Sequence, residues 1–110
     1  MSTAVLSKIA MLNDYLRASF QGGKVVTTAA VAELPSEVRA KVLDVTRKFN
    51  DFTRDNDPYG EHDCAFFQVD GERYFFKIDC YDKMMEYGSE NPEDPKVTTR
   101  VLTIGTAADY

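Results

Sequence analysis

Two segments of the chain carry apolar residues at the spacing of a helix face. In residues 3–20 the spacing of three or four residues is that of an amphipathic helix, and the apolar positions are Val5, Ile9, Leu12, Leu16 and Phe20. Ser2 or Thr3 is suited to cap the start of this helix, and Gly22-Gly23 to end it.

Residues 35–52 show the most regular helical spacing in the sequence. Their apolar positions are Val38, Val42, Val45, Phe49 and Phe52. Pro35 suits the first helical position, which needs no backbone N–H. Glu37 and Arg47 lie where their charges complement the helix dipole. A second helix is therefore predicted, preceded by a short β-branched strand at 24–28.

Residues 63–81 alternate as a β-hairpin does. Asp70-Gly71 separates two aromatic-rich runs, and both residue types tolerate the positive φ of a type I′ turn. With a two-residue loop, paired positions sum to 141, so that Phe66 faces Phe75. One face of this hairpin is apolar and is predicted to line the core, with Ala65, Phe67, Val69, Tyr74, Phe76, Ile78 and Cys80.

The same register separates the two cysteines. Cys64 would oppose Lys77 on one face, whereas Cys80 would oppose Glu61 on the other. Because a disulfide needs both side chains on one side at short distance, two reduced thiols are expected.

Residues 96–108 fit two structures. Asp94 as an N-cap and Pro95 at the first helical position favour a helix. Val97, Val101, Ile104 and Ala108 agree with that spacing. The many β-branched residues and Gly105 leave a strand open as the alternative. The helix is favoured because capping and spacing agree.

These elements predict an α+β fold formed by residues 1–110 as a single domain. We expect a small antiparallel sheet centred on the 63–81 β-hairpin, joined by 24–28 and packed with about three helices.

The composition of the chain limits the classes of partner that the protein is expected to bind. Hydrophobic residues make up 44% of the 110 residues, and thirteen basic against eighteen acidic residues give a formal charge of −5. Because the basic residues are scattered, direct binding to nucleic-acid phosphates is disfavoured, whereas a protein with a basic surface would be attracted. No apolar run approaches the roughly 18 residues that cross a bilayer, and no signal peptide is recognised, so a cytoplasmic protein without membrane contact is expected. A homodimer is left open.

The segment "NDPYGEHD" (56–63) is the main candidate for chemistry, because it places the only histidine among carboxylates. The hairpin register would set residue 62 opposite residue 79. The candidate polar site therefore gathers Asp55, Asp57, Glu61, His62, Asp63, Asp79, Tyr81 and Asp82. An imidazole among carboxylates is suited to metal binding or acid–base catalysis.

A purely structural role of this segment is favoured over a metal site. Asn, Asp, Pro and Gly gather wherever a chain turns, and one histidine supplies few nitrogen ligands. As a calcium loop the segment fails at Phe66, where a bidentate glutamate is required. No catalytic set and no cofactor-binding motif is recognised, so neither a catalytic residue nor a cofactor is assigned, and the presence of a metal is left open.

The second face of the hairpin offers a candidate partner-binding patch formed by Phe66, Arg73, Phe75 and Lys77. A helix of the same domain is expected to cover such a mixed face. If the face is open, an aromatic pair with a cationic rim is typical of a protein-binding surface.

Several segments together resemble a known family. They are "LNDYLRASFQGGKVV", "LPSEVRAKVLDVTRKFNDF", "NDPYGEHD", "VDGERYFFKIDCYD" and "DPKVTTRVLTI". From Leu12 to Tyr110 the chain resembles small bacterial proteins grouped as a domain of unknown function, with the hallmark D-N-D-P-x-G-E-H-D. It departs at Tyr59, where members often have histidine, and at Cys80, often tyrosine. The resemblance implies a stand-alone cytoplasmic domain, often encoded in accessory or plasmid-borne regions, without an established activity.

Two functions are carried forward. The first is a small acidic binding or inhibitory protein that acts by protein–protein contact, as anti-defence proteins of mobile elements (anti-CRISPR proteins among them) do. The alternative is a metal-dependent or acid–base enzyme that uses His62 with Asp57, Glu61, Asp63 and Asp79. The protein is expected not to be an enzyme.

Overall fold

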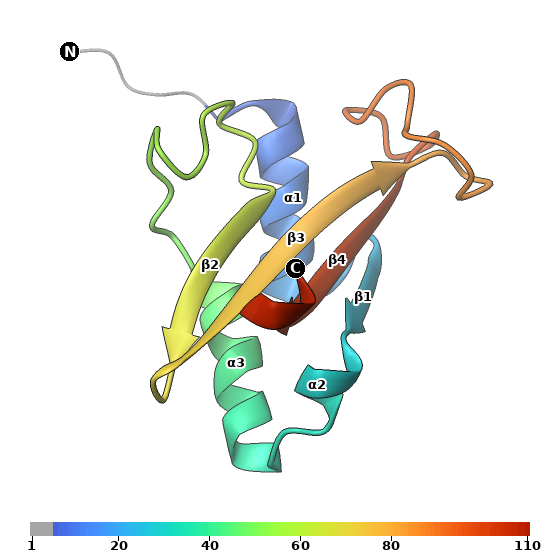
Figure 1. Cartoon of the computed structure of the whole chain (residues 1–110). Coiled ribbons are helices and arrows are strands. Elements are labelled where there is room, and N and C mark those ends of the chain that lie inside the picture. Colours follow the sequence, from blue (N-terminus) through green and yellow to red (C-terminus); the bar gives the residue numbers. More distant parts are fainter. Residues whose placement is uncertain (1–5) are drawn as a thin grey trace.

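A computed structural model describes residues 6–110. Its sheet has four strands in the order β1-β4-β3-β2, and the helices α1 and α3 lie behind this sheet (Figure 1). The strands are β1 (Lys24–Thr27), β2 (Cys64–Val69), β3 (Glu72–Tyr81) and β4 (Thr99–Thr106). The helices are α1 (Lys8–Ser19), α2 (Ala29–Ala32) and α3 (Ser36–Lys48), followed by the 3₁₀ turn η1 (Ala107–Asp109). The α+β class is confirmed, and the helices number three as expected, but α2 stands in place of the helix predicted at 96–108.

Helix α1 starts and ends at residues other than those expected. The proposed caps Ser2 and Thr3 lie outside the described residues, and the hydroxyl of Ser7 accepts the Ala10 N–H at the observed start. The helix ends at Phe20, which adopts the left-handed conformation with φ 58° and donates its N–H to the Leu16 carbonyl. The turn at Gly22 (φ 90°) follows and leads into β1.

Helix α3 confirms the second helical segment over most of its length. Pro35 stands one position before the first helical residue, and the helix ends at Lys48 because Phe49 adopts extended backbone angles. Phe49 and Phe52 are thus outside the helix, yet their rings still pack edge-to-face against Phe76 of β3. The apolar spacing therefore marked the buried residues correctly but overstated the length of the helix.

The β-hairpin has the predicted register. Cys64 pairs with Lys77 and Phe66 with Phe75, and Asp70 and Gly71 have the positive φ angles, 52° and 82°, that a tight primed turn requires. The face predicted to be apolar is buried from Ala65 to Ile78, whereas Cys80 at its end is half-buried. Both cysteines carry free thiols.

Residues 96–108 were predicted wrongly, because they form a strand instead of the favoured helix. β4 lies between β1, to which it is parallel, and β3, to which it is antiparallel. The sheet is thus mixed and not wholly antiparallel as expected. A central strand is buried on both faces and loses polar alternation, and the Asp94 carboxylate accepts the Lys96 N–H in a turn instead of starting a helix.

Gly105 explains why a glycine interrupts this strand. A Cβ atom at this position would lie 2.6 Å from the Phe75 ring and 2.8 Å from the Thr28 side chain. The close approach of these two side chains therefore requires a residue without a side chain.

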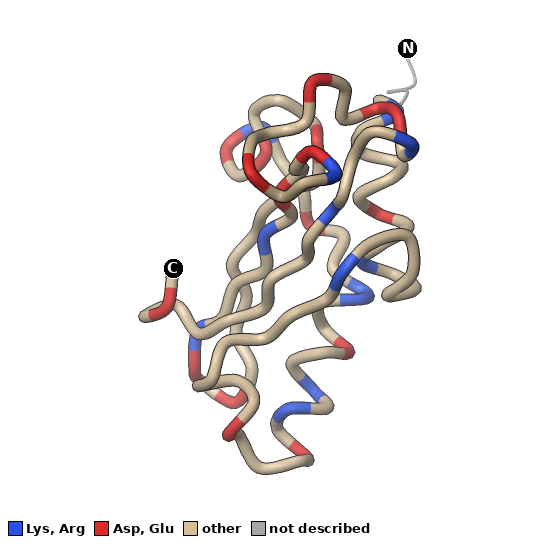
Figure 2. The backbone as a smooth tube through the Cα atoms, turned by 90° about the vertical axis from the view of Figure 1, so that its right-hand side faces the viewer, with Lys and Arg blue, Asp and Glu red and all other residues tan. Residues whose placement is uncertain are grey.

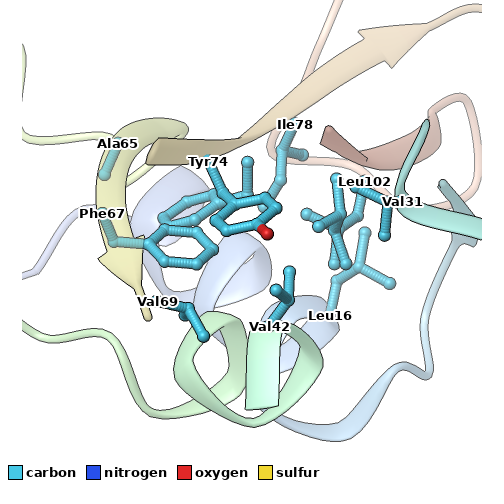
Figure 3. Close-up of a cluster of buried hydrophobic side chains, with 11 residues drawn as sticks. Leu16, Val31, Val42, Ala65, Phe67, Val69, Tyr74, Ile78 and Leu102 are labelled. Carbon is cyan, nitrogen blue, oxygen red and sulfur yellow. The ribbon is translucent and has the colours of Figure 1, made fainter. Parts of the chain in front are cut away.

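The core lies between the sheet and the helices. In Figure 3 the side chains of Phe67, Val69 and Tyr74 meet Val42 of α3 and Leu16 of α1. Leu102 of β4 and Val31 of α2 close the same cluster. Within residues 6–110, no helix has the length and apolar character needed to span a lipid bilayer.

Candidate functional site

The loop that carries the "NDPYGEHD" segment is held by its own polar side chains. Asn56 accepts the Thr53 N–H at 2.7 Å and donates to the Asp51 carbonyl at 2.8 Å. The carboxylate of Asp57 is buried and accepts the N–H groups of Glu61 and His62 at 3.1 and 3.2 Å. Asp57 therefore fixes the turn of the loop, and its carboxylate is largely occupied by backbone donors.

His62 binds helix α1 instead of the second strand of the hairpin. Its Nδ1 lies 2.9 Å from Asp14 Oδ1, and its Nε2 lies 3.7 Å from Asp57 Oδ2. The ring stacks on Phe52 with centroids 4.0 Å apart and planes 4° from parallel. The imidazole is thus enclosed by two carboxylates and one aromatic ring, with 15% of its side chain exposed.

The reason for this placement is the backbone at His62, where φ is 54°. The Ile78 N–H still donates to the Asp63 carbonyl, so the ladder reaches residue 63 and then stops. A left-handed residue cannot continue a strand, so His62 turns away from the ladder. Asp79, its expected neighbour, pairs with Lys77 at 2.8 Å.

The structure thus divides the predicted polar site into two groups. Asp57 and His62 line a hollow of about 420 Å³ together with Phe52, Arg54 and Tyr59. Glu61, Asp63 and Asp79 form the second group and line a different hollow. The remaining predicted residues, Asp55, Tyr81 and Asp82, line neither of these two hollows.

Glu61, Asp63 and Asp79 line the second hollow, of about 230 Å³. Burial, with the nearby charges of Asp63 and Asp57, raises the pKa of Glu61 above its ordinary value. The pKa of Asp63 is also raised, first by burial. The carboxyl groups of Glu61 and Asp63 are therefore close to other negative charges and partly removed from water.

Tyr81 and Asp82 belong to the end of β3 and to the connector that follows it. Tyr81 pairs with Thr99 of β4, and Asp82 accepts the Glu86 N–H at 3.0 Å. Asp55 is exposed on the loop before β2. Within residues 6–110, no three His, Cys, Asp or Glu side chains are arranged so that they could hold one metal ion.

Sequence reasoning missed three residues of α1 that organise this region. Asn13 donates to the Glu61 carbonyl at 3.0 Å, Asp14 contacts His62, and Arg17 donates to Asp14 at 2.9 Å. A signal was present, because Asn13 takes a position on the apolar stripe between Ile9 and Leu16. A polar residue on a buried stripe indicates a specific partner.

The second face of the hairpin is partly covered by the C-terminus and not by an α-helix as expected. The Tyr110 ring lies 5.0 Å from both Phe66 and Phe75, and Figure 1 shows η1 and the C-terminus in front of the sheet. Of the predicted patch, Phe75 is 2% exposed, and the Arg73 guanidinium lies over Phe66 at 4.7 Å. Lys77 is held by its pair with Asp79.

The thiols are poorly suited to nucleophilic chemistry. Burial raises the pKa of Cys64 and of Cys80 above the ordinary value of a thiol. Because the thiolate is the nucleophile, both side chains are less reactive than a free cysteine.

Acidic residues gather at one end of the molecule (Figure 2), where the loop 51–63 and the connector 79–96 lie on either side of α1 (Figure 1). These two segments hold eleven of the eighteen acidic residues and three of the thirteen basic ones, a formal charge of −8, so the rest of the chain sums to +3. We call this region the acidic end. Three large apolar side chains on it are highly exposed, namely Tyr59 (86%), Met84 (74%) and Tyr87 (73%).

Comparison with known proteins gives a family but no activity. No curated protein and no solved structure matches the chain. A family described as "Protein of unknown function (DUF3768)" matches residues 27–109, which is a shorter span than the resemblance from Leu12 implied and leaves α1 outside it. Since that match covers well over half of the sequence, this chain belongs to the DUF3768 family of proteins of unknown function.

Proposed function

We propose that this protein is a small acidic binding protein that inhibits its partner by covering a basic surface. The observation that carries this proposal is the segregation of charge, with −8 on the acidic end and +3 on the rest of the chain. A field of one sign over a single region steers a partner of opposite charge toward it. The net charge alone would not give such an orientation.

The exposed side chains on the acidic end support a protein partner. Tyr and Met are enriched at the centres of protein interfaces, and Tyr59, Met84 and Tyr87 are all largely exposed there. Their apolar surface would be buried by a partner whose basic residues meet the surrounding carboxylates. A simple counter-ion would leave these side chains in water.

An inhibitory role follows from the kind of surface that such an end would cover. Basic grooves on proteins bind the phosphates of nucleic acids, so a protein with a concentrated negative charge competes for the same groove. Anti-defence proteins of mobile elements act through contacts of this kind. The family resemblance and the small size agree with this role in the cytoplasm.

Two matched variants test the proposal. The first neutralises four exposed residues of the acidic end, by Asp55→Asn, Glu86→Gln, Glu90→Gln and Glu93→Gln. The control neutralises four exposed residues elsewhere, by Glu33→Gln, Glu37→Gln, Asp44→Asn and Glu72→Gln. Both variants change the net charge by the same amount, so a difference between them reports position and not total charge.

Capture of proteins from a lysate of the source organism is the measurement. We expect the first variant and high salt to abolish capture of the partner, and the control to retain it. The captured partner should then lose affinity for nucleic acid when the wild-type protein is added. Equal loss of capture in both variants would contradict the proposal, because only the net charge would matter.

A second candidate is a metal-dependent or acid–base enzyme that uses the "NDPYGEHD" loop. One observation favours it: the His62–Asp14 pair lies beside a hollow, and a carboxylate on one ring nitrogen orients a histidine for proton transfer. Melting scans with Mg²⁺, Mn²⁺ and Zn²⁺ are the test. A midpoint raised in the wild type but not in Asp57→Asn would favour the metal-dependent form.

A further inference from the structure

A hollow beside α1 differs in charge from the rest of the protein. It has a volume of about 390 Å³ and lies between the C-terminal half of α1, the Gly22-Gly23 turn and the segment before β4. Its lining is Leu12, Tyr15, Gly22, Gly23, Lys83, Pro95, Thr98 and Arg100. Two of these residues are cations and none is acidic, although the chain as a whole carries a charge of −5.

Arg100 is the buried cation of this hollow, with 3% of its surface exposed. Its Nε donates to Asn13 Oδ1 at 2.9 Å, and its Nη2 donates to the Pro92 carbonyl. Among residues 6–110, Nη1 has no acceptor, and it is not sealed from solvent. Arg100 lines this hollow and neither of the two hollows beside the "NDPYGEHD" loop.

The charge of Arg100 is not neutralised by the protein. No carboxylate among the described residues lies within ion-pair distance of it. A buried charge is normally paired, because leaving it alone in a medium of low polarity costs several kcal/mol. An anion at this position would therefore satisfy a group that the fold itself leaves unpaired.

Lys83 supplies a second cation at the entrance of the hollow. It is exposed, and within residues 6–110 it forms no ion pair. Arg100 offers a fixed planar donor and Lys83 a mobile point charge, a combination suited to an oxyanion.

Part of the lining of the hollow is apolar and aromatic. Tyr15, Leu12 and Pro95 form it. At Gly22, a Cβ atom would lie 3.2 Å from the Tyr15 ring, and at Gly23 it would lie 2.5 Å from the Arg100 carbonyl oxygen. The two glycines thus let the turn lie directly against both residues, so that the aromatic wall and the cation belong to one hollow.

We propose that this hollow binds a small molecule with a phosphate or carboxylate group and a flat apolar part. The anion is bound by Arg100 and Lys83, and the apolar part lies against Tyr15. The volume is in the range of small-molecule sites, roughly 300–1,000 Å³. Lys83 and Pro95 of the lining belong to the connector of the acidic end, but the exposed side chains that the proposed function uses, Tyr59, Met84 and Tyr87, do not line this hollow.

Three probes identify the chemistry that the hollow accepts. They are inorganic phosphate, phenyl phosphate and benzoate, each titrated at constant ionic strength and followed by the backbone amide signals of Gly22, Gly23 and Thr98 in nuclear magnetic resonance spectra. We expect saturable shifts with at least one aromatic anion. Tighter binding of phenyl phosphate would identify a phosphorylated ligand, and tighter binding of benzoate a carboxylated one.

Variants separate this site from general surface charge. Lys83→Gln should weaken the binding of the aromatic anion roughly threefold to fivefold, as expected for one partly exposed charge. Lys48→Gln, at another exposed lysine that lies on α3, is the control and should leave binding unchanged. Arg100→Lys keeps the charge but loses the planar donor, and should weaken binding further.

The following outcomes would overturn the proposal. They are the absence of saturable shifts with both aromatic anions, shifts with inorganic phosphate alone, or equal weakening in Lys83→Gln and Lys48→Gln. Because Lys83 is exposed, its substitution leaves the fold intact and keeps the test decisive even if the Arg100 variant unfolds.

Discussion

The surroundings of Arg17 and Arg100 show two ways in which this small protein accommodates a buried cation. Both side chains are nearly inaccessible, at 4% and 3% exposure. Arg17 is neutralised by Asp14 at 2.9 Å, donates to the Phe49 carbonyl at 2.7 Å, and lies 5.2 Å from the centres of two aromatic rings. Among residues 6–110, Arg100 is bound by uncharged oxygens of Asn13 and Pro92 and by no carboxylate.

The difference lies in whether the protein itself supplies a carboxylate for the buried cation. Arg17 connects α1 to the end of α3 and, through Asp14, to His62. Every charge in that group has a partner within the protein, which leaves little for a ligand to bind. Arg100 has its position fixed by two hydrogen bonds and has no ion pair among residues 6–110, which is the arrangement that the proposed anion site requires.

The largest effect is expected for Arg17→Ala. The substitution leaves Asp14 without its buried cation and removes the bonds to three carbonyls of α3 and the residues after it. Breaking a buried ion pair costs about 3–5 kcal/mol, to be measured by urea unfolding. Arg47→Ala, whose exposed guanidinium lies over Phe20, is the control and should cost under about 1 kcal/mol. Similar losses in the two variants would mean that Arg17 is not a structural centre.

His62→Ala should have the second largest effect, a loss of about 1–3 kcal/mol in the free energy of unfolding. The variant removes the ring that stacks on Phe52 and the partner of Asp14. Tyr59→Ala, at a highly exposed position of the same loop, should change stability by less than about 0.5 kcal/mol. An unchanged stability of His62→Ala would assign the ring to something other than holding the loop.

Arg100→Met tests whether the second buried arginine contributes less to stability than Arg17. It loses the bond to Asn13 but leaves no carboxylate unpaired, so the expected cost is about 1–2 kcal/mol, less than that of Arg17→Ala. Unfolding is measured with and without phenyl phosphate. The ligand should stabilise the wild type and have no effect on the variant. A cost as large as that of Arg17→Ala would make the two arginines equivalent.

The smallest effect on the free energy of unfolding is expected at Asp63. Its pKa is raised by burial and by the charges of Asp57 and Asp79. The native state binds this proton more tightly than the unfolded state. Its contribution to stability is therefore present below pH 3.8 and is lost as pH rises from 3.8 through the raised native value. The difference in unfolding free energy between wild type and Asp63→Asn, measured across this range, should shift in favour of the variant as pH rises. A difference independent of pH would contradict the shift.

The hairpin and α3 could be predicted because local and global signals agree in them. At Asp70-Gly71 the turn residues, the alternation on both sides and the resulting register all indicate one structure, and the structure has it. In α3 the apolar spacing identified the buried face. It failed at Phe49 and Phe52, because these rings pack on the core from an extended segment and not from a helix.

β4 could not be predicted with the same rules. A strand with neighbours on both sides and cover on both faces carries Val101, Leu102 and Ile104 without alternation. Its apolar positions therefore also fit a helix. The Asp94-Pro95 pair, which indicated a helix start, forms a turn, and local sequence does not distinguish these two uses.

The structure gives His62 of the candidate loop other neighbours than the sequence predicted. The ladder from the hairpin was extended by one residue too many, and the left-handed backbone at His62 reverses the direction of its side chain. Asp14, the actual partner, lies 48 residues away on α1. Such a contact depends on how a helix packs on a sheet, which the pattern within either segment does not encode.

The place of β4 in the sheet has a consequence for the order in which the protein can fold. β1 has β4 as its partner in the sheet, and the pairing joins Lys24 to Val101, 77 residues later. Loops of that length close slowly, and during synthesis the edge of β1 stays unpaired by β4 until residues 99–106 have been made. Until then α1 and β1 can be held only by side-chain contacts, so this half of the molecule depends on the last strand and becomes the most vulnerable part of a nascent chain.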